Sequence, residues 1–133
     1  MRLIPAELCR ALAANAVRAG ASERFDPPPL VKLYSPLSPA TWLATEMLAD
    51  DDTMFGLADL GFGCPELGYF SLSEIAALRL PFGLRILRDH AFASAVPLSH
   101  WAATARRCGS IADAEAALAA RPSNPLPPGL PDG

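Results

Sequence analysis

The sequence has few of the residues on which catalytic and metal sites are usually built. Its 133 residues include 2 histidines, 3 cysteines and a single lysine, Lys32. The cysteines are odd in number, far apart and without CxxC spacing, so neither a disulfide framework nor a zinc site is indicated. Neither His90 nor His100 stands at a ligand spacing such as HExxH. We therefore expect no metal and no cofactor.

Excess positive charge and long apolar runs are lacking as well. The formal net charge of −3 gives no general attraction to a phosphate backbone, which disfavours nucleic acid as a partner. A local basic patch formed by Arg79, Arg85 and Arg88 stays open, beside the alternative that these arginines are solvated or ion-paired surface positions. No apolar run approaches the ~20 residues that span a bilayer, and no secretory signal pattern is present. We expect a soluble, cytoplasmic protein without membrane contact.

What the sequence does contain is enough apolar material for one core. Its residues are 51% hydrophobic and 19% charged, a balance typical of a packed globule rather than a disordered chain. The length suits one domain. We expect a single α+β domain over residues 1–121. Residues 122–133 include five prolines without periodicity, which predicts a disordered proline-rich tail.

Local patterns predict the order of the elements. Pro5 suits the first turn of a helix over 5–19, and Gly20 stands just past its end. The segment Ser71-Leu72-Ser73-Glu74 is a capping box, which predicts a helix that stops before Pro81. Alternating apolar residues predict strands over 30–34, 41–47, 54–60 and 66–70, and an imperfect fifth over 84–92. Helical periodicity over 98–107 and 111–120 completes an α+β fold. It has a mainly antiparallel sheet of four to five strands, with N-terminal, central and C-terminal helices packed on it.

The motifs TW-x-x-TE, FG-x-x-x-L-G-x-G-x-PELGY-x-SL-x-E and RD-x-x-F resemble a family catalogued as domain of unknown function 2958. The family consists of small bacterial proteins often carried on mobile elements. The resemblance runs from Leu8 to Ser99, and it implies a compact α+β domain, a place in the accessory genome and no established activity. The residues in the family's order are Trp42, Thr45, Glu46, Phe55, Gly56, Pro65, Glu66, Leu67, Gly68, Tyr69, Ser71, Leu72, Glu74, Arg88, Asp89 and Phe92.

Four carboxylates form the best case for an enzyme. Glu46, Asp59, Glu66 and Asp89 could converge on a divalent metal ion, as acid/base or two-metal chemistry on a nucleic acid or nucleotide requires. The lysine that usually accompanies such acids in nucleases is absent. The alternative is structural: these carboxylates pair with an arginine or cap backbone amides beside the glycine-rich loop.

A second chemical hypothesis uses Cys64 as a nucleophile with His90 as its base. No signature of an oxyanion hole accompanies this pair. The segment Gly61-Phe62-Gly63 does not match GxGxxG and is better explained as turn geometry.

The competing hypothesis is binding to another protein. Aromatic residues exceed what one thin sheet needs inside, so Phe62 in a loop and Phe82 in a Pro-Phe-Gly turn are candidate surface anchors, unless they plug the ends of the core. Three aspartates in a turn could present negative charge to a basic partner. The predicted binding residues are Phe62, Phe82, Asp50, Asp51, Asp52, Tyr69 and Arg88. The sequence therefore favours a non-catalytic protein-binding accessory factor of a mobile element, with the metal-dependent enzyme as the alternative and direct DNA binding as the third.

Overall fold

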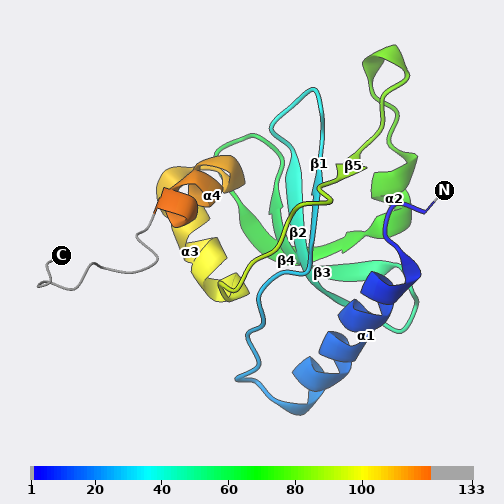
Figure 1. Ribbon diagram of the computed structural model, residues 1–133, viewed down its shortest axis with the longest axis vertical. Coiled ribbons are helices and arrows are strands. Elements are labelled where there is room, and N and C mark those ends of the chain that lie inside the picture. The colour runs from blue at the N-terminus through cyan, green and yellow to red at the C-terminus, as the bar shows by residue number, and fades with distance from the viewer. Residues whose placement is uncertain (1, 121–133) are drawn as a thin grey trace, which may run out of the picture.

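The computed structural model describes residues 2–120 (Figure 1), so the predicted tail over 122–133 lies outside the described residues. Within residues 2–120, no helix combines the length and the apolar character needed to cross a bilayer. The elements in chain order are α1 (Ala6–Ala21), β1 (Val31–Tyr34), β2 (Thr41–Met47), β3 (Thr53–Asp59), β4 (Glu66–Ser71), α2 (Leu72–Ala77), the short 3-10 helix η1 (Pro81–Gly83), β5 (Leu87–Arg88), α3 (Leu98–Cys108) and α4 (Ile111–Ala120).

The five strands form one antiparallel sheet in the order β4-β3-β2-β1-β5. Strands β1 to β4 are neighbours in both sequence and space because each is joined to the next by a short connection. Strand β5 follows α2 and η1 in the sequence and pairs with β1. The edge strands of the sheet are therefore β4 and β5. The α+β fold with an antiparallel sheet is confirmed.

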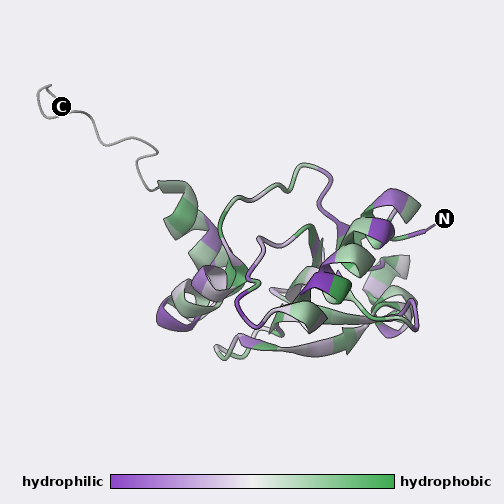
Figure 2. Ribbon diagram, turned by 90° about the horizontal axis from the view of Figure 1, so that it is seen from below, coloured by the Kyte–Doolittle hydropathy of each residue, from purple (hydrophilic) through white to green (hydrophobic). Residues whose placement is uncertain are grey.

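Helices cover both faces of the sheet, because side chains alternate along each strand. Trp42 and Ala44 of β2 belong to a core with Leu12 of α1 and Ile75 of α2. Leu43, between them, faces the other way and packs with Leu57, Trp101 and Ile111 beneath α3 and α4; these last two helices are also in contact with each other. In Figure 2 the C-terminal helices lie at the left of the sheet and the N-terminal segment at the right.

A β-bulge in β2 connects the sheet to α1. The register with β3 shifts between Ala44 and Glu46, which leaves Thr45 without a partner in the β3 ladder. Asn15 of α1 donates from Nδ2 to the carbonyl oxygen of Thr45 at 3.0 Å. The Thr45 hydroxyl lies 3.4 Å from the carbonyl oxygen of Phe55. The bulge therefore fixes the position of α1 over the sheet.

Gly56 lies in the middle of β3, opposite Ala44 on one side and Gly68 on the other. A Cβ atom at Gly56 would lie 1.8 Å from the carbonyl oxygen of Leu43 and 2.9 Å from the Cα of Ala44. A Cβ atom at Gly68 would meet nothing within 4 Å. The close approach of β2 and β3 at the bulge therefore requires glycine at position 56 and not at position 68.

Hydrogen bonds between nearby residues set the start of α2 and the end of β5. The Ser71 hydroxyl accepts from the backbone N–H of Glu74 at 3.1 Å, which confirms the predicted cap of α2. The fifth strand is only Leu87–Arg88, shorter than the predicted 84–92. It ends because Asp89 turns the chain: its carboxylate accepts from the backbone N–H of Ala91 at 2.9 Å.

Candidate functional site

The four carboxylates of the enzyme hypothesis lie in different parts of the molecule. Glu46 is opposite Phe55, which packs under α3 and α4, so Glu46 is on that face of the sheet. Asp59 is opposite Thr41, five positions along β2, and the two acids are therefore about 17 Å apart along the strands. Glu66 is opposite Ala58, which packs on the α1 face. The strand register therefore separates Glu46 from Asp59 along the sheet and places Glu66 on the other face.

Asp59 is the most buried of these acids and is engaged in holding the fold together. Its side chain is 1% exposed. One carboxylate oxygen accepts from the backbone N–H of Gly61 at 2.9 Å, and the other accepts from the backbone N–H of Ile111 at 2.9 Å. Ile111 is the first residue of α4, where N–H groups have no partner within the helix. Asp59 therefore caps α4 and anchors the loop that follows β3.

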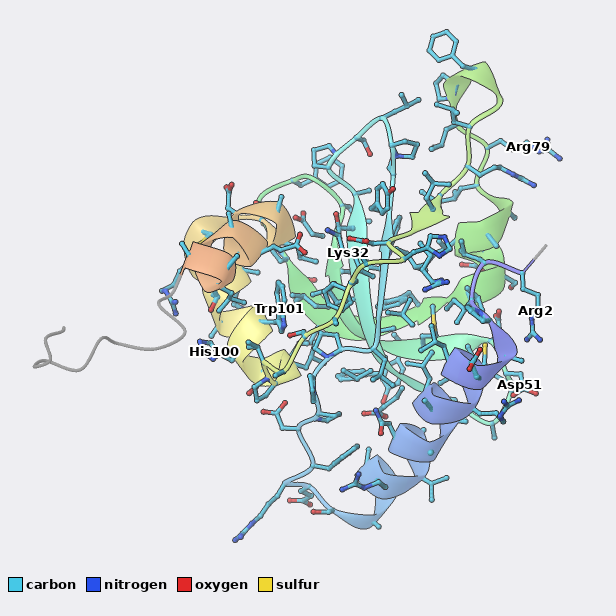
Figure 3. The ribbon with its side chains drawn as sticks, viewed as in Figure 1. Arg2, Lys32, Asp51, Arg79, His100 and Trp101 are labelled. Atoms are coloured by element: carbon cyan, nitrogen blue, oxygen red, sulfur yellow. The ribbon has the colours of Figure 1, made fainter. Side chains whose placement is uncertain are left out.

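Asp89 pairs with the single lysine of the chain. The Nζ atom of Lys32 lies 3.6 Å from a carboxylate oxygen of Asp89 and 2.6 Å from one of Glu115 in α4. The Lys32 side chain is largely buried, so these pairs are less screened than surface pairs. Lys32 connects β1, the turn after β5 and α4, and Figure 3 shows it near the centre of the molecule.

Glu46 lies in surroundings that disfavour its charge. Partial burial on the sheet raises the pKa of Glu46 above its ordinary value of 4.5. Its cross-strand neighbour Phe55 packs against Tyr69, with 5.1 Å between ring centroids. Among residues 2–120, no three His, Cys, Asp or Glu side chains form a group that could hold a metal ion. The arrangement gives Glu46 aromatic neighbours and no metal-binding group of three or more such side chains within the described residues.

Cys64 and His90 are at opposite edges of the sheet. Cys64 is in the loop before β4, and His90 follows β5. Four strand spacings separate these edges, a distance of about 19 Å. A direct proton transfer between this thiol and this imidazole is incompatible with that separation.

The acidic turn mainly serves the fold. Asp50 accepts from the backbone N–H groups of Asp52 and Thr53, at 3.0 and 2.8 Å. Asp52 accepts from the Ser71 hydroxyl at 2.6 Å, and this bond is the largest cause of the lowered pKa of Asp52. Asp51 is exposed, with a φ of 58° in the left-handed region. Asp50 and Asp51 are both exposed, so the turn presents negative charge to solvent as well as stabilising the fold.

Three loops project from the same end of the sheet, and we call this surface the loop end. They are the β1–β2 loop (35–40), the β3–β4 loop (60–65) and the arm between α2 and β5 (78–86), all at the top of Figure 1. Strand β5 pairs with Tyr34 where β1 ends, and Gly61 lies against Pro39. The loop end carries exposed large hydrophobic residues from all three loops: Leu37, Leu60, Phe62, Leu78, Phe82 and Leu84.

Phe82 is the most exposed of these residues, at 90%. It occupies the tip of the arm, and its φ of 66° lies in the left-handed region that favours glycine. The arm is closed beneath it by a hydrogen bond from the backbone N–H of Leu80 to the carbonyl oxygen of Leu84 at 2.9 Å. The turn therefore holds the Phe82 ring out into solvent.

Of the other predicted binding residues, Phe62 and Tyr69 are exposed and Arg88 is partly buried. Phe62 is 83% exposed in the β3–β4 loop, between two glycines of positive φ. Tyr69 is 66% exposed on the edge strand β4, outside the loop end. Arg88 lies on β5, with its Nη2 donating to Nδ1 of His90 at 3.0 Å. The structure thus brings Phe62 and Phe82 to one end and places Tyr69 and Arg88 on opposite edges.

Leu37, Leu60 and Leu84 belong to the same surface, although sequence reasoning did not select them. Each is an apolar residue in a segment that glycine or proline excludes from regular structure: Leu37 between Pro36 and Pro39, Leu60 before Gly61, and Leu84 after Gly83. That signal was available in the sequence. Their location at the same end of the sheet depends on the strand order, which cannot be read directly from the sequence.

The fold defines a small α+β domain built on one antiparallel sheet with helices on both faces. The chain belongs to the family described as "Protein of unknown function (DUF2958)", whose model matches residues 3–112. This range includes the whole sheet and all three loops of the loop end. No curated protein and no solved structure matches the chain.

Proposed function

We propose that this protein is a non-catalytic, protein-binding accessory factor of a mobile genetic element, and that it binds its partner through the loop end. The observation that carries the proposal is Phe82, which combines 90% exposure with a left-handed backbone conformation. That conformation costs a non-glycine residue about 1 kcal/mol or more. Because the Phe82 ring is exposed, its packing offsets little of this conformational cost. Exposed residues with a strained backbone are found at functional sites.

The composition of the loop end suits a protein interface. Aromatic residues are enriched in the buried centres of interfaces and supply most of their binding energy. Phe62 and Phe82 stand on separate loops of the loop end, with exposed leucines on the same three loops. Loops on a rigid sheet are a common way to present binding residues. A partner that covers both rings would remove a large apolar area from water.

The placement of the carboxylates favours binding over the enzyme alternative. Asp59 accepts two backbone N–H groups, and Asp89 pairs with Lys32. Glu46 and Glu66 are on opposite faces of the sheet. Hydrolysis through clustered acids requires them to converge on one reacting group, whereas the bonds of Asp59 and Asp89 stabilise the fold.

The link to a mobile element has a different basis from the binding surface. It rests on the resemblance of the sequence to a family often carried on plasmids and conjugative elements, which is analogy rather than physics. Within that setting, a non-catalytic binder would act by occupying a surface of another protein. Countering a host defence system and supporting plasmid transfer are the two roles we propose for it.

The proposal is tested by affinity capture from host lysate, with quantitative mass spectrometry of wild type and a Phe62→Ala/Phe82→Ala double variant. We expect a stoichiometric partner that the double variant loses. Val17→Ala is the matched control, because Val17 is an exposed apolar residue on α1, away from the loop end. Equal capture by wild type and the double variant, or the same loss in Val17→Ala, contradicts the proposal.

A further inference from the structure

A groove of about 600 Å³ lies along the open edge of β5, between the N-terminal segment, α2 and the base of the arm. Its polar lining is basic: Arg2, Arg85, Arg88 and His90. None of the described residues that line it is an aspartate or a glutamate. Its remaining walls are apolar apart from Tyr34. The groove therefore combines positive charge with an apolar surface, within a protein of negative net charge.

The positive charges of the groove have no counter-ion among the residues that the structure describes. Among residues 2–120, both ion pairs are made by Lys32, so Arg2, Arg85 and Arg88 have none. The Nε atom of Arg88 is buried and has no hydrogen-bond partner among these residues. An unsatisfied buried donor is unfavourable, and it costs more when the group is charged. Arg88 therefore has no carboxylate partner among the described residues.

We propose that the groove binds an acidic, extended segment of the partner protein, with its carboxylates on the arginines and its aliphatic side chains on the apolar wall. The inference rests on the proposed function, since it takes the partner to be a protein. Arginine binds carboxylates through two parallel N–H groups, which a half-buried guanidinium favours. The lining residues Arg85 and Ile86 belong to the base of the arm, so the groove adjoins the loop end.

The open edge of β5 explains why the segment is extended. Leu87 and Arg88 pair with β1 on one side, and within residues 2–120 no strand occupies the other side. Backbone N–H and C=O groups at such an edge can bind an added strand, while alternate side chains enter neighbouring pockets. A segment of this kind would place every second side chain over the groove.

Charge and shape favour a protein segment over nucleic acid. Tracking a phosphate backbone needs a stripe of basic side chains along a face. Here the cations are gathered in one groove with apolar walls, on a chain of net charge −3. Carboxylates interspersed with aliphatic residues match that pattern of charge and apolar surface.

The test is selection from a random peptide display library on the intact protein, followed by affinity measurements on the selected peptides. We expect enrichment of Asp or Glu two positions away from Leu, Ile or Val, because alternate side chains of an extended segment face the groove. Arg85→Glu, an exposed position, is expected to weaken the selected peptides about tenfold or more. Arg88→Lys keeps the charge but removes the planar fork, and is expected to weaken them as well. Arg79→Glu is the matched control, because Arg79 is on the same arm and does not line the groove.

The outcomes separate the groove from the loop end. Selected peptides that bind the Phe62→Ala/Phe82→Ala variant as they bind wild type support the groove, whatever lysate capture shows. Peptides that are lost in that variant bind the loop end instead and overturn the inference. No enrichment, enriched peptides without acidic residues, or equal binding by Arg85→Glu also overturns it. Binding of an oligothymidylate that Arg85→Glu abolishes, without peptide enrichment, would assign the groove to nucleic acid.

Discussion

Ile111 donates its backbone N–H to the buried carboxylate of Asp59 over 2.9 Å, although 52 residues separate them in the sequence. The second oxygen of that carboxylate accepts from Gly61, at the start of the loop that carries Phe62. One side chain therefore connects the end of β3, the β3–β4 loop and the first turn of α4. This connection positions one loop of the proposed binding surface relative to the helices.

Removing the Asp59 carboxylate is expected to destabilise the fold. Asp59→Ala leaves two backbone N–H groups without acceptors in a buried site, and each such group costs about 1–3 kcal/mol. We expect the free energy of unfolding to fall by about 3 kcal/mol. Asp59→Asn keeps one acceptor and is expected to lose less. Denaturant unfolding measures both, and an Asp59→Ala protein that unfolds at the wild-type midpoint would contradict this role.

Alanine is expected to act very differently at two paired glycines. Gly56→Ala places a Cβ atom 1.8 Å from the carbonyl oxygen of Leu43, which forces β2 and β3 apart. We expect a loss of about 4 kcal/mol or more, among the largest effects of a single substitution. Gly68→Ala, at the cross-strand partner, is the control and is expected to change stability by about 0.5 kcal/mol or less. Thermal unfolding of both variants compares them, and equal losses refute the account of Gly56.

The stability of the hairpin turn is expected to depend on acid pH through Asp52. The Ser71 hydroxyl and the Ser73 N–H bond to its carboxylate and lower its pKa below the ordinary value of 3.8. The folded protein then binds this proton less readily than the unfolded chain. The stabilisation is therefore present above pH 3.8 and is lost as pH falls from 3.8 to the lowered pKa.

Thermal midpoints of wild type and Asp52→Asn, measured from about pH 5 to about pH 2, check this linkage. Wild type should lose more stability than Asp52→Asn across the acid range, since the variant has no proton to bind at this position. Asp51→Asn is the control, because no hydrogen bond involving the Asp51 side chain is found within residues 2–120. Parallel curves for wild type and Asp52→Asn would show that the two serine bonds contribute nothing.

Glycine at position 82 is expected to abolish partner binding without lowering stability as alanine does. Phe82→Gly removes the ring and also relieves the left-handed conformation, whereas Phe82→Ala removes the ring and keeps the strain. We expect the glycine variant to be more stable than the alanine variant by about 1 kcal/mol. Both should lose the partner. A glycine variant less stable than the alanine variant would show that the arm is not strained at this residue.

Local patterns predicted the elements well where a single segment determines them. The strand predicted over 41–47 is β2 (Thr41–Met47), and the helix predicted over 111–120 is α4 (Ile111–Ala120). The Ser71 cap was likewise readable, because a capping box lies within four residues. The alternation and spacing that encode these elements are properties of neighbouring positions.

The parts that were missed depend on contacts between distant segments. Nothing near Asp59 in the sequence indicates that it caps a helix beginning at Ile111, and the sequence pattern alone predicts only an acid that could bind a metal. The fifth strand was predicted too long, because the turn at Asp89 is held partly by Lys32 of β1. The sequence predicts the exposure of Phe62 and Phe82, but their location at the same end of the sheet depends on the strand order.

The most direct test of the loop end as a binding surface is site-specific photocrosslinking in host cells. A photoreactive phenylalanine analogue would replace Phe62, Phe82 or, as the control, Val17. The account predicts that positions 62 and 82 crosslink to the same protein and that position 17 does not. Crosslinking from position 17 alone, from all three positions alike, or from none of them would contradict it.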